Sequence, residues 1–408
     1  MNDEREALSP EPAPLPEEVS DVTADEGSNT QAVAPAVDRP QKGKVRIALD
    51  VMGGDNAPQA IVEGAILAIK TIDGVEITMV GDENAIKAEL EKHSFEHPSL
   101  HILHAEEAIQ MDEAPSVALR KKRKSSIHIG IKTLKNAEVD AFISAGNTGA
   151  VMAVSTVILR NLEEIDRAAI AIPLPTQTGH AVLLDAGANV SCKALHLYQF
   201  GIMGSMYAQY VLDDEKPRVG LLSIGEEDIK GNETTKEAFE MLSQSSINFV
   251  GNTEAKLLYR GVADVVVCDG FTGNIALKIS ESVAEMIGVS LKAMFSDTLR
   301  GKLGYFFLRP FLADFKKRID HSEVGGAPLL GVNGAVFICH GSSNAKAIKN
   351  AIIGAKKFVE GDVNGHIKES LAKNKDVMNS RLLRDQHEGL WTQVKRKIGL
   401  NAEENQET

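Results

Sequence analysis

The sequence predicts an α/β protein with a mostly parallel sheet and helices on both faces. From about Lys44 onward, short and nearly all-apolar runs alternate with segments of helical character. A parallel sheet covered on both faces produces such runs, because its strands have no solvent side. Each run leads into a short loop rich in Gly, Asn and Thr. In sheets of this kind, ligands bind at the carboxyl ends of the strands.

Six strand–loop–helix units follow one another along the chain. The first joins VRIALDV (45–51) through GGDNAP to a helix over 58–72, and Pro58 is suited to a helix start. The others have the same order of strand, polar loop and helix. They are AFIS (141–144), AGNTG and a helix over 150–159; AVLLD (181–185), AGANVSCK and 194–212; RVGLLSI (218–224), GEEDIKGNE and 234–242; DVVVCD (264–269), GFTGN and 275–287; AVFICH (335–340), GSSN and 345–359.

The charge and the apolar content exclude several classes of protein. Apolar residues make up 43% of the 408 residues, which is enough for a sizeable core. The net charge of −13 lies mostly in the tails, with −7 in residues 1–42 and −3 in the last eight residues. No basic surface of the kind that binds nucleic acid is expected. No run approaches 18 apolar residues, and the acidic N-terminus does not resemble a secretory signal.

The three cysteines, Cys192, Cys268 and Cys339, have no metal-ligand spacing. We interpret them as small, mostly buried thiols in a reducing cytosol. Residues 1–42 hold six of the 14 prolines and few large apolar side chains, so a disordered acidic tail is expected there. Residues 43–400 are expected to form the catalytic unit, followed by a disordered tail over 401–408.

The loops are typical of a site that handles phosphate. Glycine lets the backbone approach a ligand, and the N–H groups that open the next helix attract anions. Any one loop could equally be a plain turn or cap, but six loops expected at one edge of the sheet favour phosphate. A GxxxxGK[ST] loop, a GxGxxG turn and a GxSxG elbow are all absent. The remaining donors suit an anion that acts as its own nucleophile and needs only positioning and an oxyanion pocket.

Six motifs together resemble the bacterial phosphate acyltransferase family (PlsX), over about residues 44–360. They are ALDVMGGDNAP (48–58), SAGNTGA (144–150), LLDAGANV (183–190), IGEEDIKGNE (224–233), DGFTGNIALK (269–278) and HGSSNAKA (340–347). The resemblance implies a fold like those of isopropylmalate dehydrogenases and phosphotransacetylases. It implies transfer of an acyl group from acyl carrier protein to inorganic phosphate, giving acyl phosphate for glycerol 3-phosphate acylation. A homodimer without metal or organic cofactor is expected, cytoplasmic and peripherally bound to the membrane beside the glycerol-3-phosphate acyltransferase.

Residue roles follow from the same resemblance. Lys230 would bind phosphate or the developing thioester oxyanion, although a lysine in a loop is usually only solvated. Asn274 would donate its amide to the oxyanion or phosphate, and a plain helix N-cap is the alternative. His340 could protonate the leaving thiolate, although a structural histidine is the commoner case. The other residues expected to bind substrate or phosphate are Asp50, Gly53, Gly54, Asn147, Thr148, Gly149, Asp185, Asn189, Gly231, Asn232, Thr272, Gly273, Ser342 and Ser343.

One position departs from the family pattern. Asp commonly follows the GANV motif in the family, and this chain has Ser191 there. A role for a carboxylate at that point is therefore in doubt. The 42-residue leader also lies outside the shared pattern.

Residues 291–320 differ from the rest of the chain. They contain seven basic and three acidic residues, and Phe311, Phe315 and Ile319 recur every four residues. Pro310 is expected to break or start a helix. The pattern favours a protruding amphipathic helix or helical hairpin on an anionic membrane, with core or dimer packing as the alternative. The expected membrane contacts are Phe306, Phe307, Leu308, Phe311, Leu312, Phe315, Lys316 and Lys317.

A second basic run could receive the acidic carrier protein, since a dense positive patch steers an acidic partner. Its residues are Arg120, Lys121, Lys122, Arg123 and Lys124, to which Arg160 and Arg167 could add. A solvated charged face is the ordinary alternative.

Three other functions stay open on the sequence. A dehydrogenase of the isopropylmalate type would need a nicotinamide site and carboxylates spaced for a metal. A phosphotransacetylase would use short acyl-CoA in place of the carrier protein. A membrane-associated scaffold would have no activity, which the donor-rich loops argue against.

Overall fold

The computed structural model describes residues 43–296, 298–319 and 325–379, and gives the backbone alone for residues 299 and 313–319. The predicted tails over 1–42 and 401–408 lie outside these residues. Within them, one sheet is formed by β1 (Val45–Asp50), β2 (Val75–Gly81), β3 (Leu100–His104), β4 (Ala141–Ser144), β5 (Ala169–Thr176), β6 (Gly179–Leu184), β7 (Val219–Ser223), β8 (Phe249–Glu254), β9 (Val265–Val267), β10 (Gly326–Leu330) and β11 (Ala335–Cys339).

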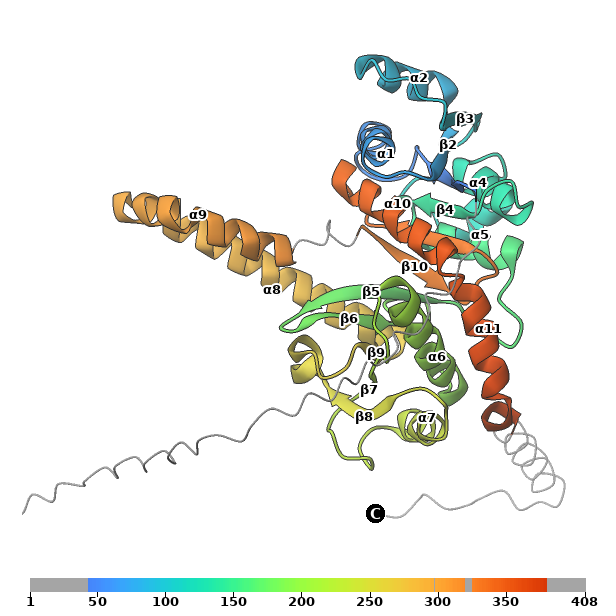
Figure 1. The fold of residues 1–408 in the computed structure, drawn as a ribbon, viewed down its shortest axis with the longest axis vertical. Helices are drawn as coiled ribbons and strands as arrows, with labels where there is room; N and C mark the ends of the chain where they lie inside the picture. Colours follow the sequence, from blue (N-terminus) through green and yellow to red (C-terminus); the bar gives the residue numbers. More distant parts are fainter. Residues whose placement is uncertain (1–42, 297, 320–324, 380–408) are drawn as a thin grey trace, which may run out of the picture. The chain divides into compact units, whose positions relative to one another are not determined.

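The helices confirm the predicted alternation (Figure 1). They are α1 (Gln59–Thr71), α2 (Glu83–Lys92), α3 (Pro115–Lys121), α4 (Ser126–Lys135), α5 (Thr148–Leu159), α6 (Ala194–Val211), α7 (Glu233–Ser243), the 3₁₀ helix η1 (Ala255–Arg260), α8 (Gly270–Ser296), α9 (Leu299–Ile319), α10 (Ala345–Glu360) and α11 (Val363–Lys373).

The sheet has two parallel halves that run in opposite directions. Its strand order is β3-β2-β1-β4-β11-β10-β5-β6-β9-β7-β8. The strands from β3 to β11 are mutually parallel, and so are those from β6 to β8. Between the halves, the pairs β11–β10, β10–β5 and β5–β6 are all antiparallel. Three reversals make the second half run opposite to the first.

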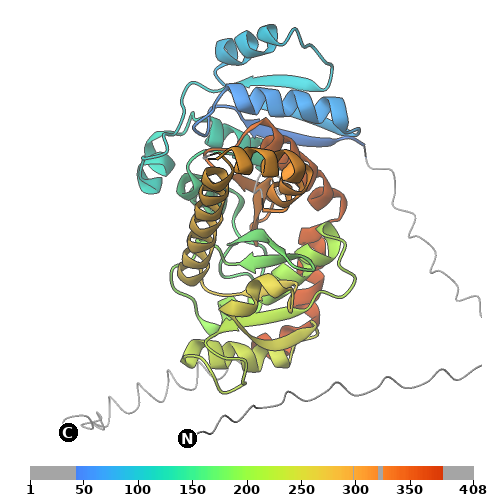
Figure 2. The same cartoon turned by 90° about the vertical axis from the view of Figure 1, so that its left-hand side faces the viewer.

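Both faces of the sheet are covered, as nearly all-apolar strands require. Ile47 and Leu49 of β1 pack in one apolar cluster with α1 and α10, and Ala48 packs in another with α4 and α5. Alternation of side chains along the strand places these residues on opposite faces. Helices α1 and α10 lie against each other in both views (Figures 1 and 2).

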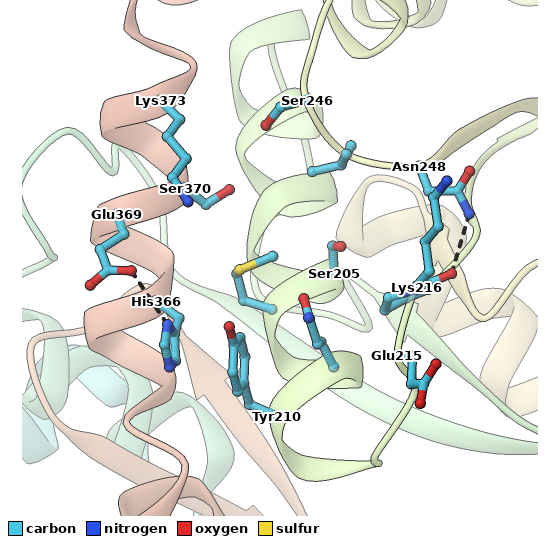
Figure 3. A pocket seen from close by; sticks show the side chains of 14 residues that line it. Ser205, Tyr210, Glu215, Lys216, Ser246, Asn248, His366, Glu369, Ser370 and Lys373 are labelled. Atoms are coloured by element: carbon cyan, nitrogen blue, oxygen red, sulfur yellow. Dashed lines mark hydrogen bonds and ion pairs between the residues drawn. The ribbon is translucent and has the colours of Figure 1, made fainter. Parts of the chain in front are cut away.

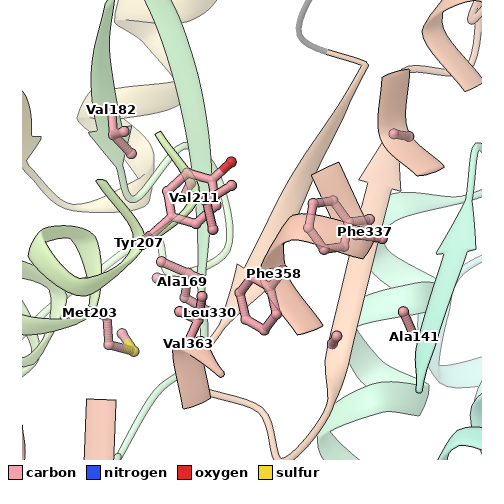
Figure 4. Close-up of a cluster of buried hydrophobic side chains, with 14 of the residues drawn as sticks. Ala141, Ala169, Val182, Met203, Tyr207, Val211, Leu330, Phe337, Phe358 and Val363 are labelled. Carbon is pink, nitrogen blue, oxygen red and sulfur yellow. The ribbon is translucent and has the colours of Figure 1, made fainter. Parts of the chain in front are cut away.

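One apolar core joins the two halves of the sheet (Figure 4). It contains side chains from β4, β5, β6, β10 and β11 together with α6, α10 and α11. Those labelled in the figure are Ala141, Ala169, Val182, Met203, Tyr207, Val211, Leu330, Phe337, Phe358 and Val363. Helix α6 is buried on most of its surface, because it packs between the sheet and α7, α10 and α11.

Two local expectations were wrong. The GFTGN segment is not a loop, because α8 already begins at Gly270 and includes it. Pro310 neither breaks nor starts a helix but lies inside α9, which continues to Ile319. Helices α8 and α9 pack against each other as a hairpin, which confirms the predicted helical segment (Figure 1).

Candidate active site

The six predicted loops do not lie at one edge of the sheet. The loops after β1, β4 and β11 leave the first half, and those after β6, β7 and β9 leave the second half. Because the halves run in opposite directions, the two groups leave opposite edges. The expectation that all six loops lie at one edge of the sheet was wrong for this reason. We call the groups the first loop group and the second loop group.

The first loop group is held by close backbone approach. Gly54 has a φ of +100°, and the neighbouring Asp55 N–H donates to the Gly341 carbonyl at 2.8 Å. A Cβ on Gly53 would lie 2.6 Å from the backbone nitrogen of Gly146. Both glycines are therefore needed where three loops meet.

Asp50 is a structural centre of this group. Its carboxylate is buried and accepts from the Ser144 hydroxyl at 2.7 Å and the Met52 N–H at 3.1 Å. Burial raises the pKa of Asp50, and hydrogen bonds from Ser126 and Ser144 oppose that rise. Ser144 connects Asp50 to the loop after β4, because its hydroxyl also accepts the Gly146 N–H at 3.0 Å.

Both the oxygen and the nitrogen of the Asn147 side chain form hydrogen bonds within the protein. Its side-chain oxygen caps α5 by accepting from the Ala150 N–H at 2.9 Å. Its amide group donates to the carbonyls of Gln110, Met111 and Glu113, at 3.2, 2.9 and 2.8 Å. Asn147 thus anchors the 110–113 segment, and its neighbour Thr148 is exposed.

The HGSSN loop completes the first group. Ser342 Oγ lies 2.7 Å from His340 Nδ1, and both side chains are exposed. Ser343 is buried, and its hydroxyl has no hydrogen-bond partner within the part of the chain that the structure describes. Buried polar atoms are nearly always bonded, so this hydroxyl is an exception in the loop.

The second loop group is organised by Asp185. Its buried carboxylate accepts from the N–H groups of Ile170, Ala188 and Asn189 at 3.0, 3.0 and 2.7 Å. Burial raises the pKa of Asp185, and these hydrogen bonds act in the opposite direction. Asn189 donates to this carboxylate at 2.9 Å and to the Ala168 carbonyl at 2.7 Å, so it also serves the loop structure.

The first turn of α8 packs directly on the Asp185 loop. A Cβ on Gly273 would lie 1.9 Å from the Asp185 carbonyl oxygen, and Gly270 donates its N–H to Asn189 O at 2.8 Å. Asp269 caps the helix, because it accepts from the Thr272 N–H at 2.8 Å and the Thr272 hydroxyl at 2.9 Å. The N-cap alternative for Asn274 is therefore wrong. Asn274 lies one turn inside the helix, exposed and beside Gly187.

Lys230 lies on the loop after β7, at the same edge as Asp185 and Asn274. Its side chain is exposed, and its N–H donates to the Glu227 carbonyl at 3.0 Å. Gly231 follows with a φ of +107°, which favours glycine. Asn232 then caps α7 by accepting from the Thr235 N–H at 2.9 Å.

The cysteines are poor nucleophiles. Burial raises the pKa of Cys192 and of Cys339 to about 12, and it raises the pKa of Cys268 as well. Cys268 and Cys339 are buried as expected, whereas Cys192 is partly exposed. Over residues 43–296, 298–319 and 325–379, no group of three His, Cys, Asp or Glu is arranged to hold a metal ion.

The basic run over 120–124 divides into paired and unpaired residues. Lys122 lies 2.7 Å from Glu113, and Lys124 lies 2.8 Å from Glu106. Arg120, Lys121 and Arg123 are exposed and form no salt bridge with the described residues. Arg160 and Arg167 are exposed as well.

The hairpin of α8 and α9 exposes many apolar side chains. In α8, only Gly270 and Gly273 are buried. Phe306, Phe307 and Phe311 of α9 are 71%, 67% and 72% exposed, and Leu308 and Leu312 also reach the surface. The side chains of Phe315, Lys316 and Lys317 lie outside the described residues. No helix of the described part is long and apolar enough to span a bilayer.

A cavity of about 280 Å³ is lined by residues outside both loop groups (Figure 3). Its walls come from α6, α11 and the segments that precede β7 and β8. Tyr210 and His366 stack on one side, with ring centroids 3.7 Å apart. None of the predicted site residues lines it. Lys230 and Asn274, the two residues predicted to act in catalysis, both lie on the second loop group, which is the candidate active site.

Sequence reasoning missed Asp269, the cap of α8, and Asn252 of β8, which contacts the Lys230 loop. Asp is one of the preferred helix N-cap residues, which is the local signal for the first. Asn252 has no local signal, because its partner is 25 residues away in the chain.

The chain has a fold like that of phosphotransacetylases. A phosphotransacetylase from Streptococcus pyogenes matches with a TM-score of 0.55 at 17% identity, covering 78% of this chain and 94% of that chain. The EutD phosphotransacetylase from Staphylococcus aureus matches with a TM-score of 0.51 at 14% identity, covering 77% and 94%. These likenesses show the fold alone.

The chain belongs to the family described as fatty acid synthesis protein, whose model matches residues 45–366. A phosphate acyltransferase from Geobacter sulfurreducens is 47% identical over 327 residues, which covers 80% of this chain and 94% of the relative. A phosphate acyltransferase from Thermodesulfovibrio yellowstonii is 47% identical over 332 residues, covering 81% and 96%. These relatives agree with the resemblance seen in the six motifs.

Proposed function

We propose that this protein transfers a fatty acyl group from acyl carrier protein to inorganic phosphate, giving an acyl phosphate for phospholipid synthesis. The observation that carries the proposal is the 47% identity to phosphate acyltransferases over 80% of the chain. The site adds chemical support. It offers an exposed ammonium and an exposed amide at one sheet edge, beside thiols whose raised pKa values make them poor nucleophiles.

Phosphate itself is the nucleophile in the proposed reaction. A phosphate oxygen attacks the thioester carbonyl carbon, the new C–O bond forms, and the C–S bond breaks with the electron pair leaving on the carrier's sulfur. No covalent acyl-enzyme is formed. The protein has to hold phosphate near the carbonyl and stabilise the oxyanion that develops.

Side chains, rather than helix N–H groups, supply the charge stabilisation. The N–H groups of Gly270, Thr272 and Gly273 are already bonded to Asn189 and Asp269. Lys230 would bind phosphate through its ammonium, and Asn274 would donate to the oxyanion. Asp185 orders the loop beneath Asn274 and does not itself react.

We propose that the first loop group binds a further part of the substrates. The exposed Ser342 hydroxyl suits an anionic group, and Gly53 and Gly54 let the neighbouring loops pack closely beneath it. Asp50 and Asn147 hold the loops of this group in place through their hydrogen bonds, so these two are positioning residues.

Two surfaces would serve the macromolecular partners. Arg120, Lys121 and Arg123 would receive the acidic carrier protein. The exposed apolar residues of α9, with Lys302 and Arg309 among them, would contact an anionic membrane that contains the glycerol-3-phosphate acyltransferase. We propose a homodimer, in which a second copy covers the exposed apolar residues of α8.

A phosphotransacetylase acting on short acyl-CoA is the second candidate, because the fold is shared with phosphotransacetylases. The two functions differ in the acyl donor, so a comparison of donors separates them.

The test is phosphate-dependent release of free carrier protein from palmitoyl carrier protein, measured for the wild type and two variants. We expect acyl phosphate from the wild type and losses of about 100-fold or more in Lys230→Ala and Asn274→Ala, the size seen when one oxyanion donor is removed. Lys236→Ala, on an exposed face of α7, is the control and should keep wild-type activity. A wild type that turns over acetyl-CoA but not palmitoyl carrier protein would favour the second candidate.

A further inference from the structure

The turn that carries Lys230 is tied to a neighbouring strand by one side chain. Asn252 of β8 is 7% exposed, and its amide nitrogen donates to the Glu227 carbonyl at 2.8 Å. The same carbonyl accepts the backbone N–H of Lys230 at 3.0 Å. One oxygen therefore links the buried strand to the residue proposed to bind phosphate.

Two buried polar atoms lie beneath this loop without a hydrogen-bond partner among the described residues. They are the side-chain oxygen of Asn252 and the hydroxyl of Ser223. Asn252 pairs with Leu221 in the parallel ladder, so Asn252 and Ser223 lie on the same face of the sheet. A Cβ on Gly231 would lie 3.2 Å from the Ser223 hydroxyl, which places that hydroxyl under the loop.

Unpartnered buried polar groups destabilise a fold, and native proteins retain few of them. An apolar residue at position 252 would avoid this cost, but it would also release the Glu227 carbonyl. The cost is consistent with a functional requirement on the loop. Lys230 has a long flexible side chain, so the position of its ammonium depends on how firmly its backbone is held.

We propose that Asn252 is the positioning residue for Lys230, and that Ser223 supports the same loop by packing beneath Gly231. The inference rests on the proposed role of Lys230 in acyl transfer. Asn252 touches no reacting atom. It acts by holding the turn from Glu227 to Lys230, so that the ammonium meets phosphate in one orientation.

The experiment measures acyl phosphate formation by full-length Asn252→Ala, Asn252→Asp and Ser223→Ala. We expect kcat to fall about 10- to 100-fold in both Asn252 variants, because a misplacement of about 1 Å costs up to that factor. The Asp variant keeps the size of the side chain but loses the donor to Glu227. Asn248→Ala is the matched control, since its amide donates to Lys216 O at 3.2 Å, before β8 begins, and it should keep wild-type kinetics.

A double-variant comparison separates positioning from general destabilisation. Asn252→Ala added to Lys230→Ala should cause no further loss of kcat, because its effect passes through Lys230. A further tenfold loss in the double variant would overturn the inference. Wild-type kcat in folded Asn252→Ala, together with an inactive Lys230→Ala, would also overturn the inference, and the proposed function would then stand.

Full activity of Lys230→Ala would instead remove the role of Lys230, and this inference with it. If Asn252→Ala does not fold, a loss of at least threefold in kcat for folded Ser223→Ala, absent in the Lys230→Ala background, supports the inference, and its absence overturns it.

Discussion

Exposed apolar side chains lie on the same loops and helix turn as the residues proposed for catalysis. Ile224 and Ile229 lie on the Lys230 loop and are 82% and 77% exposed. Val190 on the Asp185 loop and Phe271 in the first turn of α8 are 71% and 58% exposed. Such side chains are costly to leave in water, but they suit a substrate that brings a hydrocarbon chain. We infer that they contact the acyl group.

This contact predicts a dependence on chain length. Ile224→Ser should lower kcat/KM for a palmitoyl donor about tenfold and leave a butyryl donor within twofold, because only the long chain reaches the lost apolar surface. The measurement is kcat/KM for both donors with wild type and variant. Val157→Ser, which removes an exposed side chain of α5 far along the chain from these loops, is the control. Equal losses with both donors would contradict the assignment.

At the scale of single elements, the last turn of α3 and the residues just after it carry three basic side chains that other described side chains do not neutralise. Lys122 and Lys124 are held in ion pairs with Glu113 and Glu106, whereas Arg120, Lys121 and Arg123 remain exposed. Exposed charges of one sign raise the association rate of an oppositely charged partner, and salt screens the effect.

Reversal of these charges should weaken binding of the carrier protein alone. The triple variant Arg120→Glu, Lys121→Glu, Arg123→Glu should raise KM for acyl carrier protein at least tenfold at low salt, with KM for phosphate unchanged. Steady-state kinetics at two salt concentrations checks this. Lys124→Ala, which removes an already paired charge, should change KM less than twofold. An unchanged KM for the carrier protein in the triple variant would place its docking surface elsewhere.

At the scale of the whole molecule, the hairpin of α8 and α9 decides how the protein meets its surroundings. Phe306, Phe307 and Phe311 of this hairpin are exposed close together in the chain, and clustered exposed apolar side chains mark contact with a protein or a membrane.

A variant with Phe306→Ser and Phe307→Ser should lose at least fivefold in binding to vesicles that contain phosphatidylglycerol, with activity on palmitoyl carrier protein retained. Vesicle sedimentation and light scattering measure binding and oligomeric state together. Intact vesicle binding by a variant that has become monomeric would assign these residues to the dimer instead.

Much of this fold follows from local pattern, and the global arrangement does not. The six strand–loop–helix units were predicted because apolar runs and polar loops are local signals. The reversal between the halves depends on β5 and β10, which pair with each other over more than 150 residues. A local signal for one reversal was present, since Gln177 and Thr178 separate two apolar runs as a hairpin turn does.

The candidate site shows the same limit. Residue types identified Lys230 and Asn274 as donors, because their motifs are local. Asn147 was expected to line phosphate, but its amide is used by the 110–113 carbonyls, which lie more than 30 residues away. Asn252 could not be found, because burial and a carbonyl 25 residues away determine its role.

Helix α8 joins chemistry and surroundings in one rigid piece. It runs without interruption from Gly270, packed on the Asp185 loop, to Ser296 at the far end of the hairpin. Its 27 residues span roughly 40 Å at 1.5 Å per residue. A partner that binds the Ser296 end of α8 therefore also affects the orientation of Asn274, because both residues belong to one helix. On the proposed function, a lipid surface bound at that end would lie about the thickness of a bilayer from Asn274, and an acyl phosphate formed beside Asn274 would have to cover that distance to reach a membrane enzyme.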